Sequence, residues 1–238
     1  MYYLLNMKTW NDVEHVYYIN LQSRPDRKQH VEEQLQTVGL KQKATRFNAI
    51  KMDNGAIGCT MSHLKLLEMA KEQRLDHILI VEDDILFTNP TLFVQQASLF
   101  LSKHLDFDVV LIAGNNCPPF TSIDESCVQV NRCQTTTGYL VMNHYYDTLI
   151  ANYRSGLLKL LREPNNHKIY AIDKYWFQLQ AIHKWYLIIP LTNTQREDYS
   201  DIEKRNTNYS SVMLDLDKVA FFKRQQELAS LRKLYGVL

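Results

Sequence analysis

Three consecutive carboxylates, Glu82, Asp83 and Asp84, have the types and the spacing that metal chemistry needs. They follow a short apolar run at residues 78–81, which is typical of a strand buried on both faces. Unpaired carboxylates inside such a strand would be costly, so we expect them where the strand leaves the sheet. Carboxylates at positions i and i+2 point to one side and can bind a hard cation. The pattern therefore predicts a metal–diphosphate site, although a solvated acidic turn would have the same sequence.

Other residues that could bind a ligand precede these acids in the chain. Arg24 follows the first predicted strand, and its planar guanidinium suits phosphate, although a charge cluster at a helix start explains it equally well. Gly55 and Gly58 would let the backbone approach a flat ligand closely, or they simply form a turn. Ser62 and His63 lie at the start of the helix that follows, where a lone histidine is more often structural than a ligand.

Strands and helices alternate over the first half of the sequence. We predict strands at residues 15–21, 45–50, 78–81 and 106–113, and helices at 28–38, 61–74 and 90–104, the second of them capped by Thr60 or Ser62. Such alternation is typical of a mostly parallel sheet that is covered by helices. In open sheets of this kind ligands bind at the carboxyl ends of the strands, which is where the three acids would lie.

The second half is less regular. It is predicted to hold a loop at 115–132, strands at 138–142 and 186–191, helices at 145–161 and 173–182, and a polar loop at 195–211. The last segment, 215–238, is predicted to form a helix with Leu228, Leu231 and Leu234 on one stripe. We expect this helix to dock on the core rather than on a membrane or a partner.

Composition limits the classes of protein that the chain can belong to. It has 238 residues, of which 45% are hydrophobic, and this suits one domain with a sizeable core. The net charge of +1 gives no general field that would attract nucleic acid. The four cysteines have no zinc-site spacing, and no apolar run is long enough for a secretory or membrane-spanning segment. We therefore expect a soluble cytoplasmic protein without a transmembrane segment.

Several segments, in a fixed order, resemble the family 25 glycosyltransferases, which include bacterial lipooligosaccharide galactosyltransferases and collagen hydroxylysine galactosyltransferases. The matching segments are residues 18–21 with 24–27, 46–49, 55–63, 80–84, 137–139, 172–173, Pro190 with Gln195, and 200–202. The resemblance spans roughly residues 16–202. It departs from the family at Ala56, where an acidic residue is often found, and this puts one donor contact in doubt.

This resemblance implies an α/β fold of the GT-A type, with a Rossmann-like, mostly parallel central sheet flanked by helices and a smaller acceptor-side lobe. It implies a single domain over residues 1–238, in which residues 1–114 bind the nucleotide sugar and residues 115–238 face the acceptor. The implied reaction moves a hexose, galactose or glucose, with inversion from a UDP-sugar to a hydroxyl of a glycan, a lipooligosaccharide or a collagen-like protein. The implied cofactor is Mn²⁺ or Mg²⁺.

The same resemblance assigns roles to particular residues. Asp84 and Glu82 would bind the metal, and Asp201 is a further candidate for a metal or sugar contact. The donor contacts would come from Asn20, Leu21, Arg24, Asn48, Gly58, Ser62, Asp83 and Gln195. Inversion needs one general base on the acceptor side, and our candidate is Asp173, at the start of a predicted helix. An ordinary helix N-cap would explain Asp173 equally well.

Two other functions compete with an active transferase. The first is a nucleotide-sugar-binding protein that has lost catalysis, which the intact Glu82, Asp83 and Asp84 argue against. The second is a Mg²⁺-dependent phosphoryl or nucleotidyl transferase, and the P-loop that some of these enzymes carry does not occur in this sequence.

Overall fold

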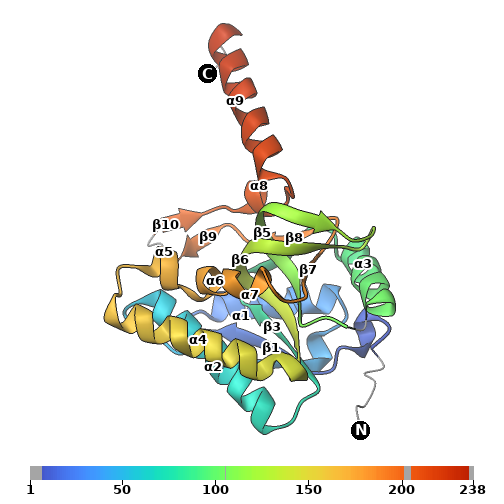
Figure 1. Cartoon of the computed structure of the whole chain (residues 1–238), viewed down its shortest axis with the longest axis vertical. Coiled ribbons are helices and arrows are strands. Elements are labelled where there is room, and N and C mark those ends of the chain that lie inside the picture. The colour runs from blue at the N-terminus through green and yellow to red at the C-terminus, as the bar shows by residue number, and fades with distance from the viewer. Residues whose placement is uncertain (1–6, 105, 201–204, 236–238) are drawn as a thin grey trace.

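A six-stranded sheet forms the centre of the molecule in the computed structural model, which describes residues 7–104, 106–200 and 205–235 (Figure 1). The strand order is β2-β1-β3-β6-β5-β7. Their bounds are Val16–Asn20 for β1, Ala44–Asn48 for β2, His77–Glu82 for β3, Val109–Ser122 for β5, Cys127–Met142 for β6 and Trp185–Ile188 for β7. β6 runs antiparallel to both β3 and β5, and the other pairings along this order are parallel. The mostly parallel sheet predicted from the sequence is therefore confirmed.

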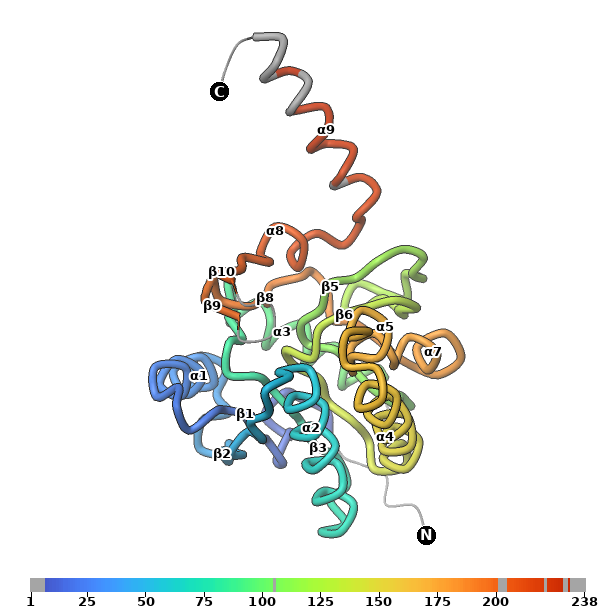
Figure 2. The backbone as a smooth tube through the Cα atoms, turned by 90° about the vertical axis from the view of Figure 1, so that its left-hand side faces the viewer, coloured from blue at the N-terminus to red at the C-terminus, as the bar shows by residue number. Residues whose placement is uncertain are grey.

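Helices cover both faces of this sheet. The longer ones in its two layers are α1 (Pro25–Thr37), α2 (Gly55–Glu72), α3 (Pro90–Lys103) and α4 (Tyr146–Arg162). Side chains of β3 alternate between the faces, because Leu79 packs in one hydrophobic cluster with α1 and α3, and Ile80 packs in the other with α2 and α4. α2 and α4 lie side by side in both views (Figures 1 and 2).

Shorter elements complete the described chain. Three short helices, α5 (His167–Tyr170), α6 (Ile172–Tyr175) and α7 (Phe177–Gln180), replace the single helix predicted at 173–182. The polar loop predicted at 195–211 contains β9 (Asp198–Ser200), β10 (Arg205–Thr207) and α8 (Ser210–Met213). A separate two-stranded sheet is formed by β4 (Ile85–Phe87) and β8 (Asn193–Gln195). Single 3-10 turns occur at Trp10–Asp12, Lys41–Lys43 and Asn143–Tyr145.

The prediction of a loop at 115–132 is wrong, because β5 and β6 continue through these residues as a long hairpin. Val128 and Val130 of this hairpin are buried, so alternate positions still face the core. Pro118 and Pro119, which suggested a loop, lie where the strand register shifts between Cys117 and Phe120. A proline at such an irregularity removes no ladder hydrogen bond.

The predicted start of the second helix is also wrong, since α2 begins six residues earlier than expected, at Gly55 rather than at residue 61. Asn54 is the N-cap, and its Oδ1 accepts hydrogen bonds from the amides of Ala56 at 3.0 Å and Ile57 at 3.4 Å. Gly58 therefore lies inside the helix. A Cβ atom there would come within 2.5 Å of the Ile50 carbonyl oxygen, so glycine permits a close approach of helix and loop.

The C-terminal helix α9 (Lys218–Tyr235) projects away from the body of the molecule instead of docking on it, as Figures 1 and 2 show. Val219, Leu228 and Leu231 are exposed, and the side chain of Leu234 lies outside the described residues. Charged and polar residues are interspersed among these few apolar ones, so docking would bury little apolar surface. Within the described residues, no helix is both long enough and apolar enough to cross a bilayer.

Candidate active site

The acidic triplet lies at the carboxyl end of β3, in the turn that leads to β4. The pairing of β4 with β8 places Gln195 opposite Ile85, directly beside the acids. A cavity of about 280 Å³ opens at this end of the sheet, and all three carboxylates line it. This is the sheet edge at which the sequence predicted a ligand site.

Asp84 is the least satisfied of the three acids. Its Oδ2 accepts a hydrogen bond from Nε2 of Gln195 at 3.2 Å and lies 3.9 Å from Nη1 of Arg27. Its Oδ1 is buried and has no hydrogen-bond partner within the described part of the chain. Burial, together with the charges of Glu82 and Asp83, raises the pKa of Asp84 to about 8. A bound divalent cation would satisfy the orphaned oxygen and offset the repulsion, so the residues present fit a metal.

Asp83 faces the arginine side of the site. Its Oδ1 accepts a hydrogen bond from Nη1 of Arg27 at 3.2 Å, and its Oδ2 accepts one from Nδ2 of Asn20 at 2.8 Å. Burial raises the pKa of Asp83, although the charge of Arg27 opposes this shift. Both carboxylate oxygens are thus held by protein donors.

Glu82 is held from the opposite side. Its Oε1 accepts hydrogen bonds from Oγ1 of Thr136 at 2.8 Å and from Nε2 of His63 at 3.2 Å. Burial acts to raise the pKa of Glu82, but the interactions with His63 and Thr136 outweigh it and lower the pKa. Glu82 therefore stays ionised in a position from which its second oxygen can face the cavity.

A buried chain of hydrogen bonds supports Glu82 from behind. His63 is fully buried, and its Nδ1 lies 2.8 Å from the hydroxyl of Tyr139, which in turn accepts a hydrogen bond from the hydroxyl of Tyr153 at 3.2 Å. If Nε2 of a neutral His63 donates to Glu82, Nδ1 must accept from Tyr139. Ligand atoms of Cys59, His63 and Glu82 also lie within 4.8 Å of one another, and the same holds for His104, Asp124 and Cys127. Each of these groups of three could hold a metal.

Three arginines that line the cavity converge on one carboxylate, that of Asp198. Oδ2 of Asp198 lies 2.7 Å from Nη2 of Arg24, 3.1 Å from Nε of Arg27 and 3.3 Å from Nη2 of Arg196. The Arg24 guanidinium also binds Asp26. The three arginines are matched in charge by Asp26, Asp83 and Asp198, so a diphosphate would have to share or displace one of these carboxylates.

The structure brings most of the predicted donor residues together. Leu21, Arg24, Gly58, Ser62, Asp83 and Gln195 line the same cavity as Glu82 and Asp84. The hydroxyl of Ser62 donates to the Gly58 carbonyl and accepts from the Ile50 amide, so it is already engaged.

Two predicted donor residues do not line this cavity. Asn20 is buried, with its Nδ2 bonded to the Arg24 carbonyl and Asp83 and its Oδ1 bonded to Arg46. Asn48 is exposed on β2 and accepts a hydrogen bond from Arg46. Asn20 and Asn48 therefore contact residues near the cavity without lining it themselves. Asp201 lies outside the described residues.

A second cavity, of about 750 Å³, adjoins the first and contains Asp173. Glu82, Cys59 and Gln195 line both cavities, so the two are continuous. Asp173 is not an N-cap: α6 begins after Ala171 without a side-chain cap, and Oδ2 of Asp173 accepts from the amide of Thr135 on β6 at 3.2 Å. Burial raises the pKa of Asp173, which makes its carboxylate a better proton acceptor than an exposed one.

Comparison with known proteins agrees with this geometry. Residues 51–157, which include the acidic triplet, match the family described as Glycosyltransferase family 25 (LPS biosynthesis protein). A protein of Drosophila pseudoobscura pseudoobscura named "Glycosyltransferase 25 family member" is 24% identical over 199 residues, covering 71% of this chain and 30% of that protein. This chain thus spans about a third of the length of that relative.

A solved structure also resembles this chain. It is the crystal structure of mannose-1-phosphate geranyltransferase from Thermus thermophilus, which superposes with a TM-score of 0.47 at 8% identity. The likeness covers 74% of this chain and 73% of that one.

Proposed function

We propose that this chain, of which residues 51–157 match glycosyltransferase family 25, transfers a hexose, galactose or glucose, from a UDP-sugar to an acceptor hydroxyl. The observation that carries the proposal is the orphaned, buried Oδ1 of Asp84 at a strand end. It lies in a cavity that also holds three arginines and that continues into a second cavity containing Asp173. The strand order, with one antiparallel strand inside a parallel sheet, is consistent with a GT-A fold.

In the proposed reaction the acceptor hydroxyl oxygen attacks the anomeric carbon of the sugar from the face opposite the diphosphate. The bond between that carbon and the diphosphate oxygen breaks, its electron pair leaves with UDP, and the configuration inverts. The hydroxyl proton passes to the carboxylate of Asp173. A bound Mn²⁺ or Mg²⁺, held by Asp84 and Glu82, would neutralise charge on the leaving diphosphate.

The residues of the chain divide this work between the two cavities. Arg24 and Arg27 are positioned to orient the diphosphate beside the acids. Gln195 lies on the wall that both cavities share, where it can contact the donor sugar. Asp173 lines only the second cavity, which we assign to the acceptor. The substrate therefore bridges the amino-terminal and carboxyl-terminal halves of one domain.

UDP together with Mn²⁺ is expected to raise the melting temperature more than GDP does. A ligand at a hundred times its dissociation constant adds about 2.7 kcal/mol to the free energy of unfolding, which is on the order of 5–10 °C for a domain of this size. Thermal-shift assays with each nucleotide, with and without EDTA, measure this. Equal protection by GDP and UDP would contradict the choice of uridine nucleotide, and protection that persists in EDTA would contradict the metal.

A further inference from the structure

Among the described residues, three cations that line the second cavity make no ion pair within 4.0 Å, although the charge of Lys174 acts on its neighbour Asp173. They are Arg132 on β6, Lys168 on α5 and Lys174 on α6. Within the same part of the chain, none of the three has a carboxylate within 4.0 Å in an ion pair. The arginines of the first cavity differ, because Arg24 and Arg27 are both paired with Asp198.

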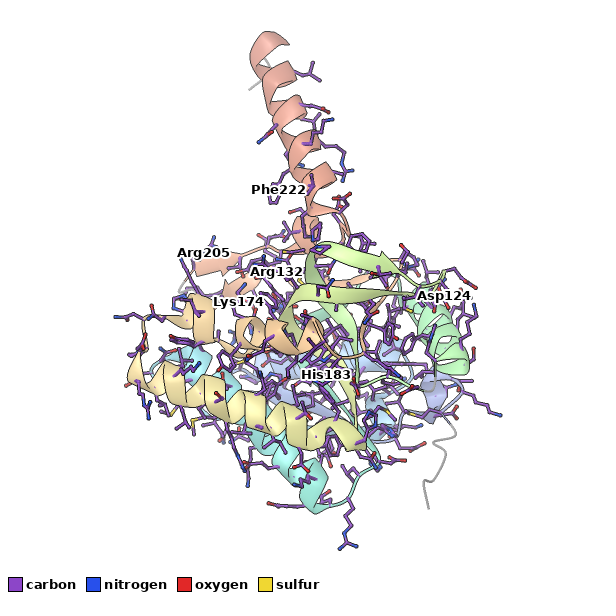
Figure 3. All side chains as sticks on the ribbon, in the orientation of Figure 1. Asp124, Arg132, Lys174, His183, Arg205 and Phe222 are labelled. Atoms are coloured by element: carbon purple, nitrogen blue, oxygen red, sulfur yellow. The ribbon has the colours of Figure 1, made fainter. Side chains whose placement is uncertain are left out.

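Two of these cations lie against one aromatic ring. The guanidinium carbon of Arg132 is 5.5 Å from the centroid of the Phe177 ring, and Nζ of Lys174 is 5.9 Å from it. Figure 3 shows Arg132 and Lys174 near each other on the same side of the molecule. Cation–π contacts of this kind hold the stems of long side chains in place while the charged groups remain available to a ligand.

The carboxylates of the cavity are placed differently from its cations. Glu82 also lines the first cavity, and Asp173 is close enough to Glu82 for the two charges to interact. Arg132, Lys168 and Lys174 do not line the first cavity. Glu82 thus lies on the wall that the two cavities share, whereas the three cations, like Asp173, line only the second cavity.

We propose that the molecule bound in the second cavity carries a negatively charged group, a phosphate or a carboxylate, that contacts Arg132 and Lys174. The description of that molecule as an acceptor rests on the proposed function. Arg132 and Lys168 are exposed at this wall, so a neutral glycan would leave them solvated, whereas an anionic sugar would gain charge-assisted hydrogen bonds from the cations. The Phe177 ring lines the same cavity and contacts both Arg132 and Lys174.

Binding of small probes tests this inference directly. Glucose 6-phosphate, glucuronic acid and glucose can be titrated calorimetrically into the wild-type protein, with UDP and Mn²⁺ added to fill the first cavity. We expect at least one of the two anionic sugars to bind about tenfold or more tightly than glucose, and which one does so distinguishes phosphate from carboxylate. The double variant Arg132→Gln/Lys174→Gln should lose that preference. Raising the ionic strength should weaken it as well.

Arg162→Gln provides the matched control, because Arg162 is an exposed arginine on α4 that does not line either cavity. It should keep the preference for the anionic sugar. Equal binding of glucose and both anionic probes would overturn the inference, as would a preference that survives in the double variant. Binding of UDP to the wild-type protein reports separately on the proposed function, since it does not depend on the second cavity. If UDP fails to bind but the Arg132-dependent preference persists, the anion site stands and the transferase proposal fails.

Discussion

The Asp84→Ala variant is expected to lose metal-dependent UDP binding almost completely. Asp84 offers the one buried carboxylate oxygen at the end of β3 that has no protein donor among the described residues. Glu82 and Asp83 are each held by neighbouring side chains, so neither is placed to take over as the principal cation ligand. Loss of a direct ligand should weaken UDP binding in Mn²⁺ by on the order of a hundredfold or more. Calorimetric titration of UDP into both proteins measures this.

The same substitution should stabilise the metal-free protein. The pKa of Asp84 is raised to about 8, above the value of roughly 3.9 for an unfolded chain. The unfolded state therefore loses this proton first, and stability falls as pH rises from about 4 toward 8. Removing the acid should recover on the order of a few kcal/mol at pH 9 in EDTA. A lower melting temperature for Asp84→Ala under these conditions would mean that the carboxylate stabilises the fold through Gln195 instead.

Asp173→Asn is expected to abolish sugar transfer while leaving donor binding near normal. An asparagine keeps the size of the side chain and an oxygen that can accept from the Thr135 amide, so folding should change by about 1 kcal/mol or less. Loss of a general base typically costs on the order of 10²–10⁴ in rate. Transfer assays with a UDP-hexose, run beside UDP calorimetry, separate the two effects.

The outcome that would contradict this role is transfer by Asp173→Asn within a few fold of wild type. Asp198 or Asp201 would then be the next candidate for the base. Three arginines bind the carboxylate of Asp198, and Asp201 lies outside the described residues. Asp198→Asn and Asp201→Asn would test the alternatives with the same pair of assays.

The sheet could be predicted because its signals are local. Runs such as residues 78–81 are apolar and β-branched, and the helices between them repeat at helical spacing. The hairpin at 115–132 could not be predicted in this way, because its prolines and polar residues resemble a loop. Its alternation becomes visible only once β5 and β6 are paired.

The site was predictable in part for a similar reason. Acids at a strand end have a sequence signature, and so Glu82 and Asp84 were found. Arg196 was not assigned to the site, because it reaches the site through the pairing of β4 with β8, which joins residues more than a hundred positions apart. The cations at Arg132, Lys168 and Lys174 come from three separate elements, and only folding brings them to one cavity.

Asn20 shows how a residue can be linked to a site without touching its ligand. The resemblance to family 25 predicted it as a donor contact near the end of the first predicted strand. In the fold it is buried, and its side chain joins Asp83 to Arg46 and to the backbone of Arg24. The sequence does not distinguish a side chain at this position that holds charged neighbours in place from one that binds the substrate.

The measurement that tests the central claim most directly is release of UDP from a panel of UDP-hexoses by the wild-type protein in Mn²⁺. We predict metal-dependent release from at least one of them, stimulated by an acceptor, suppressed by EDTA and lost in Asp84→Ala. A protein that binds UDP in Mn²⁺ but releases none from any donor, with any acceptor, would be a binding protein and not a transferase. The absence of both binding and release would contradict the assignment of this cavity to a nucleotide sugar.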